Sequence, residues 1–480
     1  MRPRLHSGGR SVTRSGHLPR ILGLETEYAI VSHRIIPEQG KDTSPLSPAE
    51  CIDELFRGTS TQNRARNRYL SNGGRLYVDL GSHPEYATAE CSNARDVAVN
   101  DRAGEHLLLD LLNAANERLA IKNIRLHLLK TNTDSGDATF GCHENYQVLR
   151  ETIESLDPGF ISFLVTRIIL TGAGGIDVKG NYVLSPRAFH IHQVTSADPT
   201  KQRPLIVTRE EAHADAEKYA RLQVTFGDSN MAETATEMKL RYTSTVLDYL
   251  EGGGTLADLA LADPIAALRD TSRLGPDTAL DLADGGTTTA LKLQEHVLQR
   301  CEEQGSSELS DIRHMINCLK AGDSRSISDS VDWICKRGLL TQAAAKHQLD
   351  LASPLISRLN LAFHDIDEKH GLADRLRRAG NLKTLFDPEE IASAKTNPPG
   401  DTRARVRGYF ISEADRLELQ YSVSWTHVRL DSPPQPQIDL MDASSSQDKR
   451  VAALVEKMKT LPPQTLSALA RLKAGLGPLH

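Results

Sequence analysis

Two short segments of the sequence carry carboxylate side chains at the spacing of a β-strand. In Leu24–Tyr28, the period of two along a strand puts Glu25 and Glu27 on one face. Neighbouring carboxylates repel each other unless solvent or a cation lies between them. Mg²⁺ takes carboxylate oxygens and keeps waters for a substrate phosphate. The pair therefore indicates either a bound hard cation or the exposed polar face of an edge strand.

The second segment, RLYVDL, sorts its side chains in the same way. Arg75, Tyr77 and Asp79 share one face, and the alternate positions are apolar. Glu85 and Glu90 follow after a turn that contains Gly and Pro. This concentration of carboxylates beside an apolar-backed strand favours a metal site or an acid–base site over a solvated face.

Other charged segments leave a structural and a functional role open. The segment HENY at 143–146 lacks the second histidine of a zinc-protease motif, so Glu144 either faces a metal or is structural. Arginines and acids mix in Arg203–Glu233, whose central HADAEKYARL has a helical pattern, and they suit either phosphate or mutual ion pairs. Alternating arginines in Thr402–Arg407 indicate a strand that either binds an anion or clamps neighbouring carboxylates.

Several nucleotide-binding and hydrolase motifs are absent from the sequence. It contains no G-x-x-x-x-G-K-[ST] loop, no convincing G-x-G-x-x-G after a strand and no G-x-S-x-G elbow. P-loop and Rossmann modes of nucleotide binding are therefore disfavoured. Carboxylate-bearing strands with scattered arginines instead favour ATP held through Mg²⁺ on a β-sheet platform.

The spacing of apolar residues predicts the elements that position these side chains. We expect an α+β fold with strands first, a helical layer after them, and a last strand and two helices beyond it. The predicted strands are Ile21–Val31, Arg75–Leu80, Arg125–Lys130 and Arg403–Ser412, and the predicted helices are Asp101–Ala120, Ser306–Leu319, Ser326–Lys346, Gln447–Lys459 and Gln464–Lys473.

Composition limits the class of protein. The chain has 480 residues, a hydrophobic share of 39% and a net charge of −6, which suits a large core and a smaller second unit and argues against a dominant nucleic-acid function. Five arginines without an acid predict a disordered basic tail at 1–20, and with proline-containing breaks at 397–401 and 432–436 we expect a catalytic domain at 21–410 and a small C-terminal domain at 411–480. Neither a membrane span nor a secretory signal is found, and the six dispersed cysteines indicate reduced thiols, so we expect a cytoplasmic protein.

Six collinear segments resemble the signatures of the Pup ligase and Pup deamidase family, where Pup is the prokaryotic ubiquitin-like protein. They are GLETEYAI, NGGRLYVDLGSHPEYATAEC, NTDSGDATFGCHENY, REEAHADAEKYARL, GDSNMAET and DTRARVRG, and together they extend from about residue 20 to residue 430. The family is related to glutamine synthetases. The resemblance therefore implies a curved, mostly antiparallel sheet packed with helices that carries ATP and Mg²⁺.

The resemblance also assigns roles to single positions. It implies that Mg²⁺ is bound by Glu25, Tyr77 and Glu85, that Asp79 is the catalytic base, and that ATP is contacted by Arg75, Thr88 and Trp425. The implied partners are Pup or a Pup-like modifier and lysine-bearing substrate proteins. Extra residues at 1–20, Tyr409 in place of a usual Glu, and a divergent C-terminus after about 431 set this chain apart from the family pattern.

Within the family, the residues favour a ligase that joins the C-terminal glutamate of the modifier to substrate lysines through a γ-glutamyl phosphate and so tags proteins for proteasomal degradation. The deamidase branch, which also removes Pup, has a long insertion between the two carboxylate strands, whereas only 54 residues separate Glu25 from Asp79 here. The wording DLGSHPEYATAEC is also similar to the ligase version. A Pup deamidase or depupylase, an inactive modifier-binding paralogue and a small-molecule glutamate–amine ligase are the alternatives.

Overall fold

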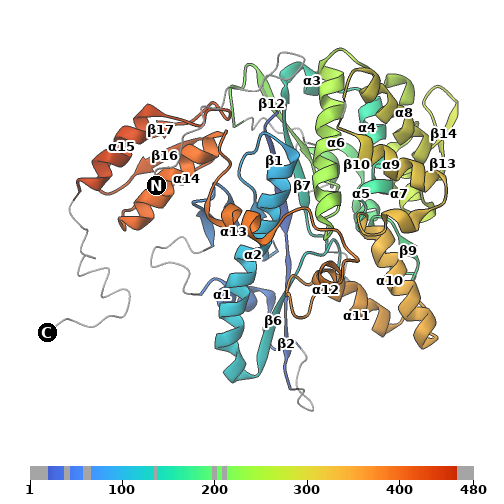
Figure 1. Ribbon diagram of the computed structural model, residues 1–480, viewed down its shortest axis with the longest axis horizontal. Coiled ribbons are helices and arrows are strands. Elements are labelled where there is room, and N and C mark those ends of the chain that lie inside the picture. Colours follow the sequence, from blue (N-terminus) through green and yellow to red (C-terminus); the bar gives the residue numbers. More distant parts are fainter. Residues whose placement is uncertain are drawn as a thin grey trace.

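An eight-stranded sheet forms the centre of the molecule (Figure 1). In the computed structural model, residues 20–36, 44–57, 66–79, 81–134, 138–196, 203–207, 213–306 and 308–461 are described. Neighbouring strands are antiparallel, except that β10 and β11 run parallel. In spatial order the strands are β10 (Gln193–Ser196), β11 (Pro204–Val207), β12 (Tyr219–Val224), β7 (Cys142–Leu149), β1 (Leu22–Glu27), β5 (His83–Ala87), β4 (Arg75–Asp79) and β3 (Asn67–Tyr69).

Helices pack behind this sheet, and the α+β prediction is confirmed. The longest helix, α2 (Ala94–Leu119), contacts β1 and β5 and also packs against α6 (Glu233–Glu251). The other helices are α1 (Pro48–Leu55), α3 (Arg150–Glu154), α4 (Pro158–Thr166), α5 (Ile168–Thr171), α7 (Pro264–Leu274), α8 (Ala290–Glu303), α9 (Ser310–Lys320), α10 (Asp332–His347), α11 (Pro354–Phe363), α12 (Leu372–Arg378), α13 (Pro388–Thr396), α14 (Arg403–Arg416) and α15 (Lys449–Lys459).

The expected helices at 101–120, 306–319 and 326–346 correspond to α2, α9 and α10. Helix α2 begins before its predicted start, because the Asn93 side chain caps it by accepting from the amide of Asp96. The predicted helix at 464–473 and nearly all of the basic tail at 1–20 lie outside the described residues. None of the described helices is long and apolar enough to cross a membrane.

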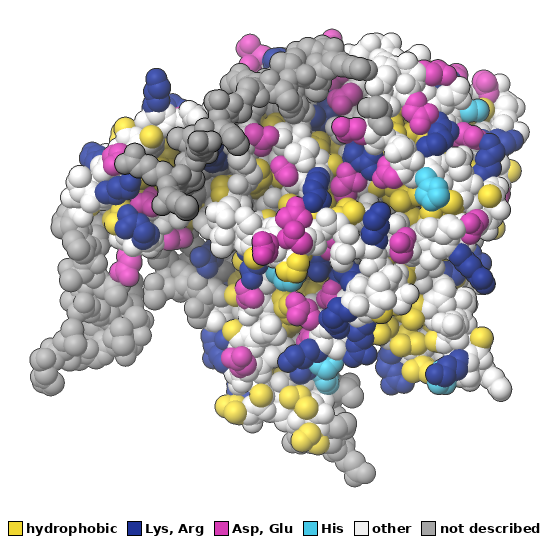
Figure 2. Space-filling view, viewed as in Figure 1, with side chains coloured by type: hydrophobic (Ala, Val, Ile, Leu, Met, Phe, Trp, Pro, Cys, Tyr) yellow, Lys and Arg dark blue, Asp and Glu magenta, His cyan; other side chains and the backbone are white. Residues whose placement is uncertain are grey.

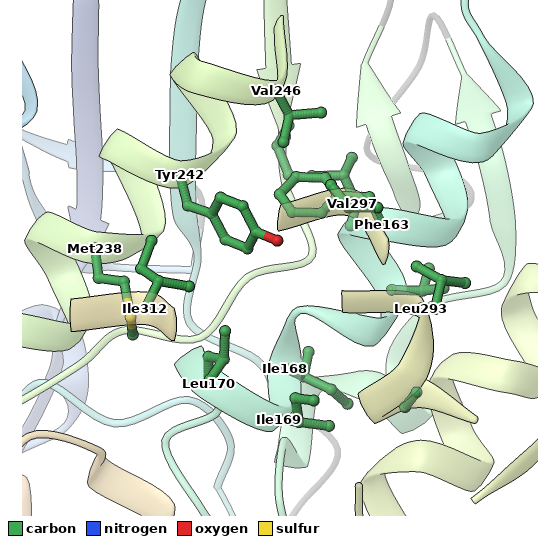
Figure 3. Close-up of a cluster of buried hydrophobic side chains, with 14 of the residues drawn as sticks. Phe163, Ile168, Ile169, Leu170, Met238, Tyr242, Val246, Leu293, Val297 and Ile312 are labelled. Atoms are coloured by element: carbon green, nitrogen blue, oxygen red, sulfur yellow. The ribbon is translucent and has the colours of Figure 1, made fainter. Parts of the chain in front are cut away.

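The largest hydrophobic cluster lies between the β7–β12 half of the sheet and the helices beside it (Figure 3). Phe163 of α4 and Tyr242 of α6 meet edge to face with ring centres 4.9 Å apart. Val297 of α8 and Ile312 of α9 complete the cluster from the outer helices. The helical layer therefore supports the sheet from one face and leaves the other face for polar side chains.

The strand expected at 21–31 is interrupted at Tyr28. Strand β1 belongs to the large sheet, whereas β2 (Ala29–Arg34) pairs with β6 (Ile124–Leu129) in a separate two-stranded sheet. The Tyr28 amide donates to Pro84 O (2.9 Å), and its ring is fully buried. One apolar stretch therefore serves two sheets. Two-stranded pairs also form between β8 (Gly175–Ile176) and β9 (Tyr182–Val183), and between β13 (Ala279–Asp281) and β14 (Thr287–Thr289).

The C-terminal part forms a small lobe with its own apolar cluster, at the left of Figure 1. Helices α14 and α15 pack there with a sheet of β15 (Tyr421–Val423), β16 (His427–Leu430) and β17 (Ile438–Asp439). The strand predicted at 403–412 is wrong, because these residues form α14, capped by the Thr402 side chain. Its buried positions Val406, Phe410 and Ala414 recur at helical spacing. The predicted domain boundary at 410/411 falls inside this helix.

The helix predicted at HADAEKYARL is also wrong. Tyr219–Val224 is strand β12, and the described residues just before it form turns. Pairing with β7 through the register Leu222↔Tyr146 buries Leu222 in the core of the sheet. The tertiary partner therefore overrides the local helical pattern.

Helix α2 approaches the sheet closely at Gly104. A Cβ atom on this residue would lie 2.2 Å from the ring of Tyr86, which is fully buried and accepts a hydrogen bond from Asn72 Nδ2 (2.9 Å). Tyr86 sits on β5 beside Glu85. The absence of a side chain at Gly104 therefore sets the distance between α2 and a strand that carries candidate site residues.

We predict that Gly104→Ala lowers the free energy of unfolding by about 1–3 kcal/mol, because the extra methyl group must displace the Tyr86 ring. Gly338→Ala is the matched control: Gly338 is exposed on helix α10 with nothing near its Cβ position, and there we expect a gain of up to about 1 kcal/mol. Urea denaturation followed by circular dichroism measures both values. Equal effects at the two positions would contradict the close packing.

Candidate active site

The polar face of the sheet carries side chains from five adjacent strands. Register places Glu27 opposite Glu85, and Tyr77 on the other side of Glu85. Because directly opposed residues point to the same face, carboxylates from β1, β5 and β4 converge. On the β7 side, Glu25 lies opposite His143. The faces predicted from strand periodicity for the two carboxylate segments are therefore correct.

Two overlapping groups of potential metal ligands lie on this face. Glu25, Glu85 and His143 form one group, and Glu27, Asp79 and Glu85 form the other, with the ligand atoms of each group within 4.8 Å of one another. Glu85 belongs to both groups. Asp79 stands at the exposed end of β4, whereas Glu85 is buried. The structure thus brings Glu25, Asp79 and Glu85 together, although they come from three strands.

Glu85 lies in an unfavourable electrostatic environment. Burial, together with the negative charges of Glu25 and Glu27, raises its pKa well above the usual carboxyl value. Tyr77 hydrogen-bonds to it, and burial together with the negative charges of Glu25 and Glu85 raises the pKa of the Tyr77 phenol. Tyr77 therefore stays a neutral hydroxyl that contacts the carboxylate group.

The outer carboxylates have positive or hydrogen-bonding neighbours. Burial alone would raise the pKa of Glu25, but the hydrogen bond and charge of His143 and the charge of Arg221 outweigh it, so this pKa is lowered. Its Oε2 lies 3.2 Å from His143 Nδ1, and its Oε1 lies 3.8 Å from Arg221 Nη1. The pKa of Glu27 is lowered against the effect of burial chiefly by His83, whose Nδ1 lies 2.8 Å from it.

These residues fit a hard divalent cation. The donors are carboxylate oxygens, which Mg²⁺ prefers, and they come close enough to share ions. The pKa of Glu85 is raised because excess negative charge is buried there. A bound cation would remove this cause.

A concave cavity opens beside the carboxylates. Thr88 and Trp425 line it, and Glu25 forms the end nearest the carboxylate group. Thr88 is fixed by accepting a hydrogen bond from the Leu24 amide (3.0 Å). Two residues expected to contact ATP thus lie in one cavity, which the C-terminal lobe helps to form through Trp425.

Arg75 lies on the same polar face but is absent from the lining of the cavity. Its guanidinium stacks over the Tyr77 ring at 4.2 Å, and its Nε donates to Asn67 Oδ1 (3.0 Å). Arg75 is thereby held next to the carboxylate group. From this position its charge faces the region between the carboxylates and the C-terminal lobe, where Tyr69 contacts both Arg75 and Trp425.

Glu90 does not join the carboxylate site, contrary to the sequence interpretation. Arg407 binds both of its oxygens, and Arg403 Nε binds Oε1 at 2.8 Å. Charge from the two arginines lowers the pKa of Glu90 to about 2 despite burial. Of the two roles considered for 402–407, the carboxylate clamp is the one the structure has. A helix, not a strand, puts residues 403 and 407 on one face.

This clamp, made of Glu90, Arg403 and Arg407, positions the Trp425 side of the cavity. Arg407 Nη1 donates to the Trp425 carbonyl at 3.0 Å, and its guanidinium lies 4.9 Å from the Trp425 ring centre. Sequence reasoning missed this connection, because residues more than 300 positions apart have no local pattern in common. The only available signal was the spacing of the arginines.

Glu144 is structural. It is fully buried and forms two hydrogen bonds with Arg167, at 2.6 and 2.9 Å. Its neighbour His143 faces the site instead, as strand alternation requires. Of the two roles considered for Glu144, the structural one is therefore confirmed, and His143 is the residue of HENY that lies at the site. Gln223, which donates to Glu25 at 3.1 Å, was missed altogether.

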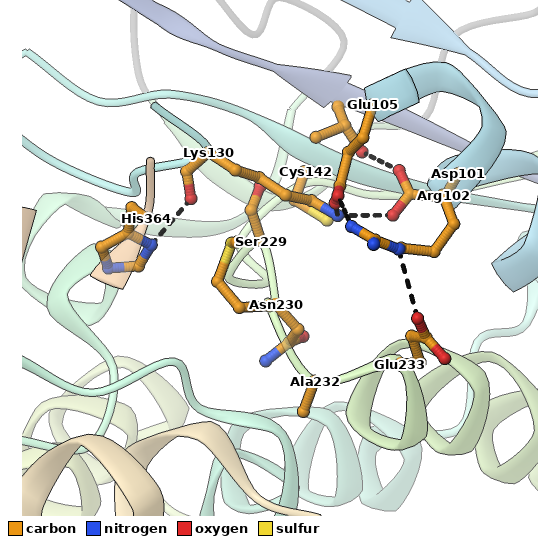
Figure 4. Close-up of polar contacts among 12 residues, drawn as sticks. Asp101, Arg102, Glu105, Lys130, Cys142, Ser229, Asn230, Ala232, Glu233 and His364 are labelled. Atoms are coloured by element: carbon orange, nitrogen blue, oxygen red, sulfur yellow. Dashed lines mark hydrogen bonds and ion pairs between the residues drawn. The ribbon is translucent and has the colours of Figure 1, made fainter. Parts of the chain in front are cut away.

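A buried ionic network supports β1 from behind (Figure 4). Lys130 Nζ lies 2.5 Å from Asp101 and 2.7 Å from Glu105, and Arg102 connects Glu105 to Glu233. Asp101 also accepts from the Thr26 hydroxyl at 2.8 Å. Thr26 lies between Glu25 and Glu27, so the network fixes the strand whose other face carries the two carboxylates.

The sequence and fold match proteins of one family. The family model for Pup-ligase protein matches residues 20–429. The chain is 39% identical to the Pup–protein ligase of Sanguibacter keddieii, over 92% of this chain and 99% of that protein. It is 38% identical to the Pup–protein ligase of Mycolicibacterium smegmatis, again over 92% of this chain and 99% of the relative.

Two solved structures are similar along most of the chain. One is the complex between the prokaryotic ubiquitin-like protein Pup and its ligase PafA, with a TM-score of 0.85, 31% identity, and coverage of 96% of this chain and 95% of that one. The other is the Pup ligase PafA in complex with ADP, with a TM-score of 0.78, 33% identity, and coverage of 88% and 96%.

We predict a pH-dependent contribution of Glu90 to stability. Its folded-state pKa of about 2 lies below the ordinary value, so its stabilising effect is complete above pH about 4.5 and is lost as the pH falls toward 2. Glu90→Gln should lower the free energy of unfolding at pH 7 by about 3–5 kcal/mol, because two buried arginines lose their carboxylate.

Denaturant titrations between pH 7 and pH 3 measure the difference in the free energy of unfolding between the wild type and Glu90→Gln. This difference should become smaller below pH about 4.5. Glu456→Gln, which breaks an exposed pair with Lys459, is the control, and its effect should stay below about 1 kcal/mol. If the difference in the free energy of unfolding between the wild type and Glu90→Gln does not change with pH, the clamp does not stabilise the protein through the charge of Glu90.

Proposed function

The chain belongs to the Pup-ligase family, and we propose that it joins the C-terminal glutamate of Pup, or of a Pup-like modifier, to lysines of substrate proteins at the expense of ATP. The observation that carries the proposal is the group of Glu25, Asp79 and Glu85 at the end of a cavity lined by Thr88 and Trp425. The named relatives are Pup–protein ligases over nearly their whole length, which favours the ligase over the deamidase branch.

The reaction has two steps. In the first, a side-chain carboxylate oxygen of the modifier's terminal glutamate attacks the γ-phosphorus of ATP, and the bond to the β-phosphate oxygen breaks. This gives a γ-glutamyl phosphate and ADP. In the second, the lysine amine attacks the acyl carbon, and phosphate leaves. Thr88 and Trp425 hold the nucleotide, while the guanidiniums of Arg75 and Arg221 stabilise the negative charge near the transferring group.

Asp79 is the catalytic base. A lysine side chain is protonated at neutral pH and becomes nucleophilic only after it loses a proton. Asp79 is suited to accept this proton, because it stands at the exposed end of β4, where an incoming protein surface can reach it. Glu27 is nearby, and its negative charge also attracts the lysine ammonium.

Glu25 and Glu85 would hold Mg²⁺ through their carboxylate oxygens, and the Tyr77 hydroxyl would contact the same group. When bound there, Mg²⁺ would neutralise phosphate charge and align the γ-phosphate with the acceptor carboxylate. Glu27 also lies next to Glu85 and belongs to the second group of potential ligands.

The modifier and the lysine-bearing proteins are the macromolecular partners, and conjugation marks these proteins for proteasomal degradation. We propose that it acts in the cytoplasm. All six cysteines are free thiols, which suits a reducing compartment.

The function is tested by incubating the protein with ATP, Mg²⁺, a lysine-bearing acceptor and a Pup that ends in glutamate. Mass spectrometry should find modifier plus acceptor less one water, and none without ATP. Conversion of a glutamine-ended Pup to the glutamate form, without any adduct, would place the protein in the deamidase branch. Neither reaction, with Pup still bound, would support the inactive paralogue, whereas ligation of free glutamate to small amines would reveal a small-molecule ligase.

We predict that Asp79→Asn reduces conjugation by at least about 100-fold, since a positioned base contributes about 10²–10⁴-fold. Binding of ADP, measured by calorimetry, should stay within about threefold of the wild type, because the side chain lies outside the cavity lining. The contrast between lost conjugation and kept binding separates a catalytic role from misfolding. Full conjugation by Asp79→Asn would remove Asp79 from this role.

We further predict that Glu85→Gln raises the Mg²⁺ concentration needed for half-maximal ATP turnover by at least about tenfold, because it removes a charged ligand from the centre of both groups. The same variant should be at least as stable as the wild type without metal, since it removes a carboxylate whose raised pKa marks an unfavourable buried charge. Glu456→Gln serves as the control. An unchanged Mg²⁺ requirement would exclude Glu85 as a ligand.

A further inference from the structure

The side chain of Gln223 connects two strands that are not neighbours in the central sheet. It is half-buried on β12, and β7 lies between β12 and β1. Gln223 stands opposite Asn145 of β7, while Glu25 of β1 stands opposite His143 of β7. The Gln223 side chain extends across β7, and its Nε2 donates to Glu25 Oε2 at 3.1 Å. This contact takes no part in the two chemical steps.

The two carboxylate oxygens of Glu25 have different surroundings. Oε2 accepts the hydrogen bond from Gln223 and also lies 3.2 Å from Nδ1 of His143. A carboxylate oxygen has two lone-pair sites, so these two contacts occupy Oε2. Oε1 lies 3.8 Å from Arg221 Nη1, which is beyond hydrogen-bond length, and this nitrogen donates to Asn145 Oδ1 at 3.3 Å. Oε1 is therefore the oxygen that can face a cation.

A carboxamide suits this position because it donates a hydrogen bond without carrying a charge. A lysine or an arginine here would attract the Glu25 carboxylate to itself and would compete with a cation for it. A further carboxylate would add negative charge to a site where Glu85 is already buried among like charges. The neutral donor fixes the direction of the Glu25 carboxylate and leaves its negative charge for the ion.

The strand that carries Gln223 is held in the sheet by other interactions. Strand β12 pairs with β7 along residues 219–224. Leu222 is fully buried on the opposite, apolar face of the same strand. Loss of one half-buried side-chain contact therefore leaves β12 in place. The effect of this contact falls on Glu25 and not on the fold.

We propose that Gln223 is a positioning residue for the metal site: its amide turns Glu25 so that Oε2 faces β12 and Oε1 faces Mg²⁺. The proposal rests on the proposed function, in which Glu25 is a ligand of Mg²⁺, and it adds the group that orients this ligand. A ligand that is oriented beforehand loses less conformational freedom when the ion binds. Partners that hydrogen-bond to a ligating group typically contribute about 10–100-fold to metal affinity.

The test is calorimetric titration of the full chain with ADP at a series of Mg²⁺ concentrations, which requires neither Pup nor an acceptor protein. Gln223→Leu keeps the approximate size but removes the donor. It should raise the Mg²⁺ concentration for half-maximal ADP binding at least about tenfold. Gln299→Leu is the matched control, because it removes an exposed amide-to-carboxylate hydrogen bond to Glu303 on α8. It should leave this concentration within about twofold of the wild type.

Gln223→Lys separates the effect of charge from that of the donor. Lysine keeps a donor but adds a positive charge, so this variant should also raise the Mg²⁺ concentration that ADP binding requires. Its effect should become smaller at high ionic strength, whereas the effect of Gln223→Leu should not. Wild-type behaviour of Gln223→Lys would show that a neutral donor is not needed and would overturn that part of the proposal.

Thermal unfolding without metal guards against misfolded variants, and the Tm of each variant should stay within about 3 °C of the wild type. An unchanged Mg²⁺ requirement in folded Gln223→Leu would overturn the proposal. So would ADP binding by the wild type that does not depend on Mg²⁺. Failure of the separate conjugation assay, with Mg²⁺-dependent ADP binding kept and weakened by Gln223→Leu, would refute the ligase function and leave the role of Gln223 in place.

Discussion

The mutual repulsion of carboxylates gathered on one face of three neighbouring strands is the constraint on which the rest of the structure depends. Glu85 is buried near Glu25 and Glu27, and burial together with their negative charges raises its pKa, so keeping this carboxylate charged in that place is unfavourable. Much of the support that holds these residues in place comes from behind the sheet. Thr26 is held by Asp101, whose own charge is balanced by the buried Lys130. The positive and negative charges of this ionic network thus nearly balance. The network therefore fixes β1 without adding negative charge to the face of the sheet that carries the site.

Paired charges also join the C-terminal lobe to the sheet. Glu90 follows the site strand β5, yet Arg403 and Arg407 neutralise it completely, and the same arginine that binds Glu90 also binds the Trp425 carbonyl. The cavity therefore depends on an ion pair between segments that are distant in sequence. Buried ion pairs of this kind contribute little net stability, but breaking one leaves an uncompensated charge. Their effect is to allow one arrangement of lobe and sheet and to penalise others.

Sequence patterns predicted the faces of the strands better than the partners of their side chains. The period of two placed Glu25, Glu27, Tyr77 and Asp79 on the site face, because one strand face is apolar and fixes the other. The same pattern could not show that Glu144 meets Arg167, since that arginine lies at the junction of helices α4 and α5. In α14, alternating arginines imitated a strand, while the buried Phe410 and Ala414 followed a helical period. Partners brought together by tertiary packing, such as Glu90 and Arg407, leave no local signal.

The histidines of the active site act on the outer sides of the carboxylates. Nδ1 of His143 lies next to Glu25, and Nδ1 of His83 lies next to Glu27, so each imidazole is a hydrogen-bonding partner of one carboxylate. Since Mg²⁺ prefers oxygen ligands, the carboxylates that converge at the centre decide which ion the site suits. The histidines fix the orientation and charge of these carboxylates, so residue type alone, without the order from the centre outward, does not specify the metal.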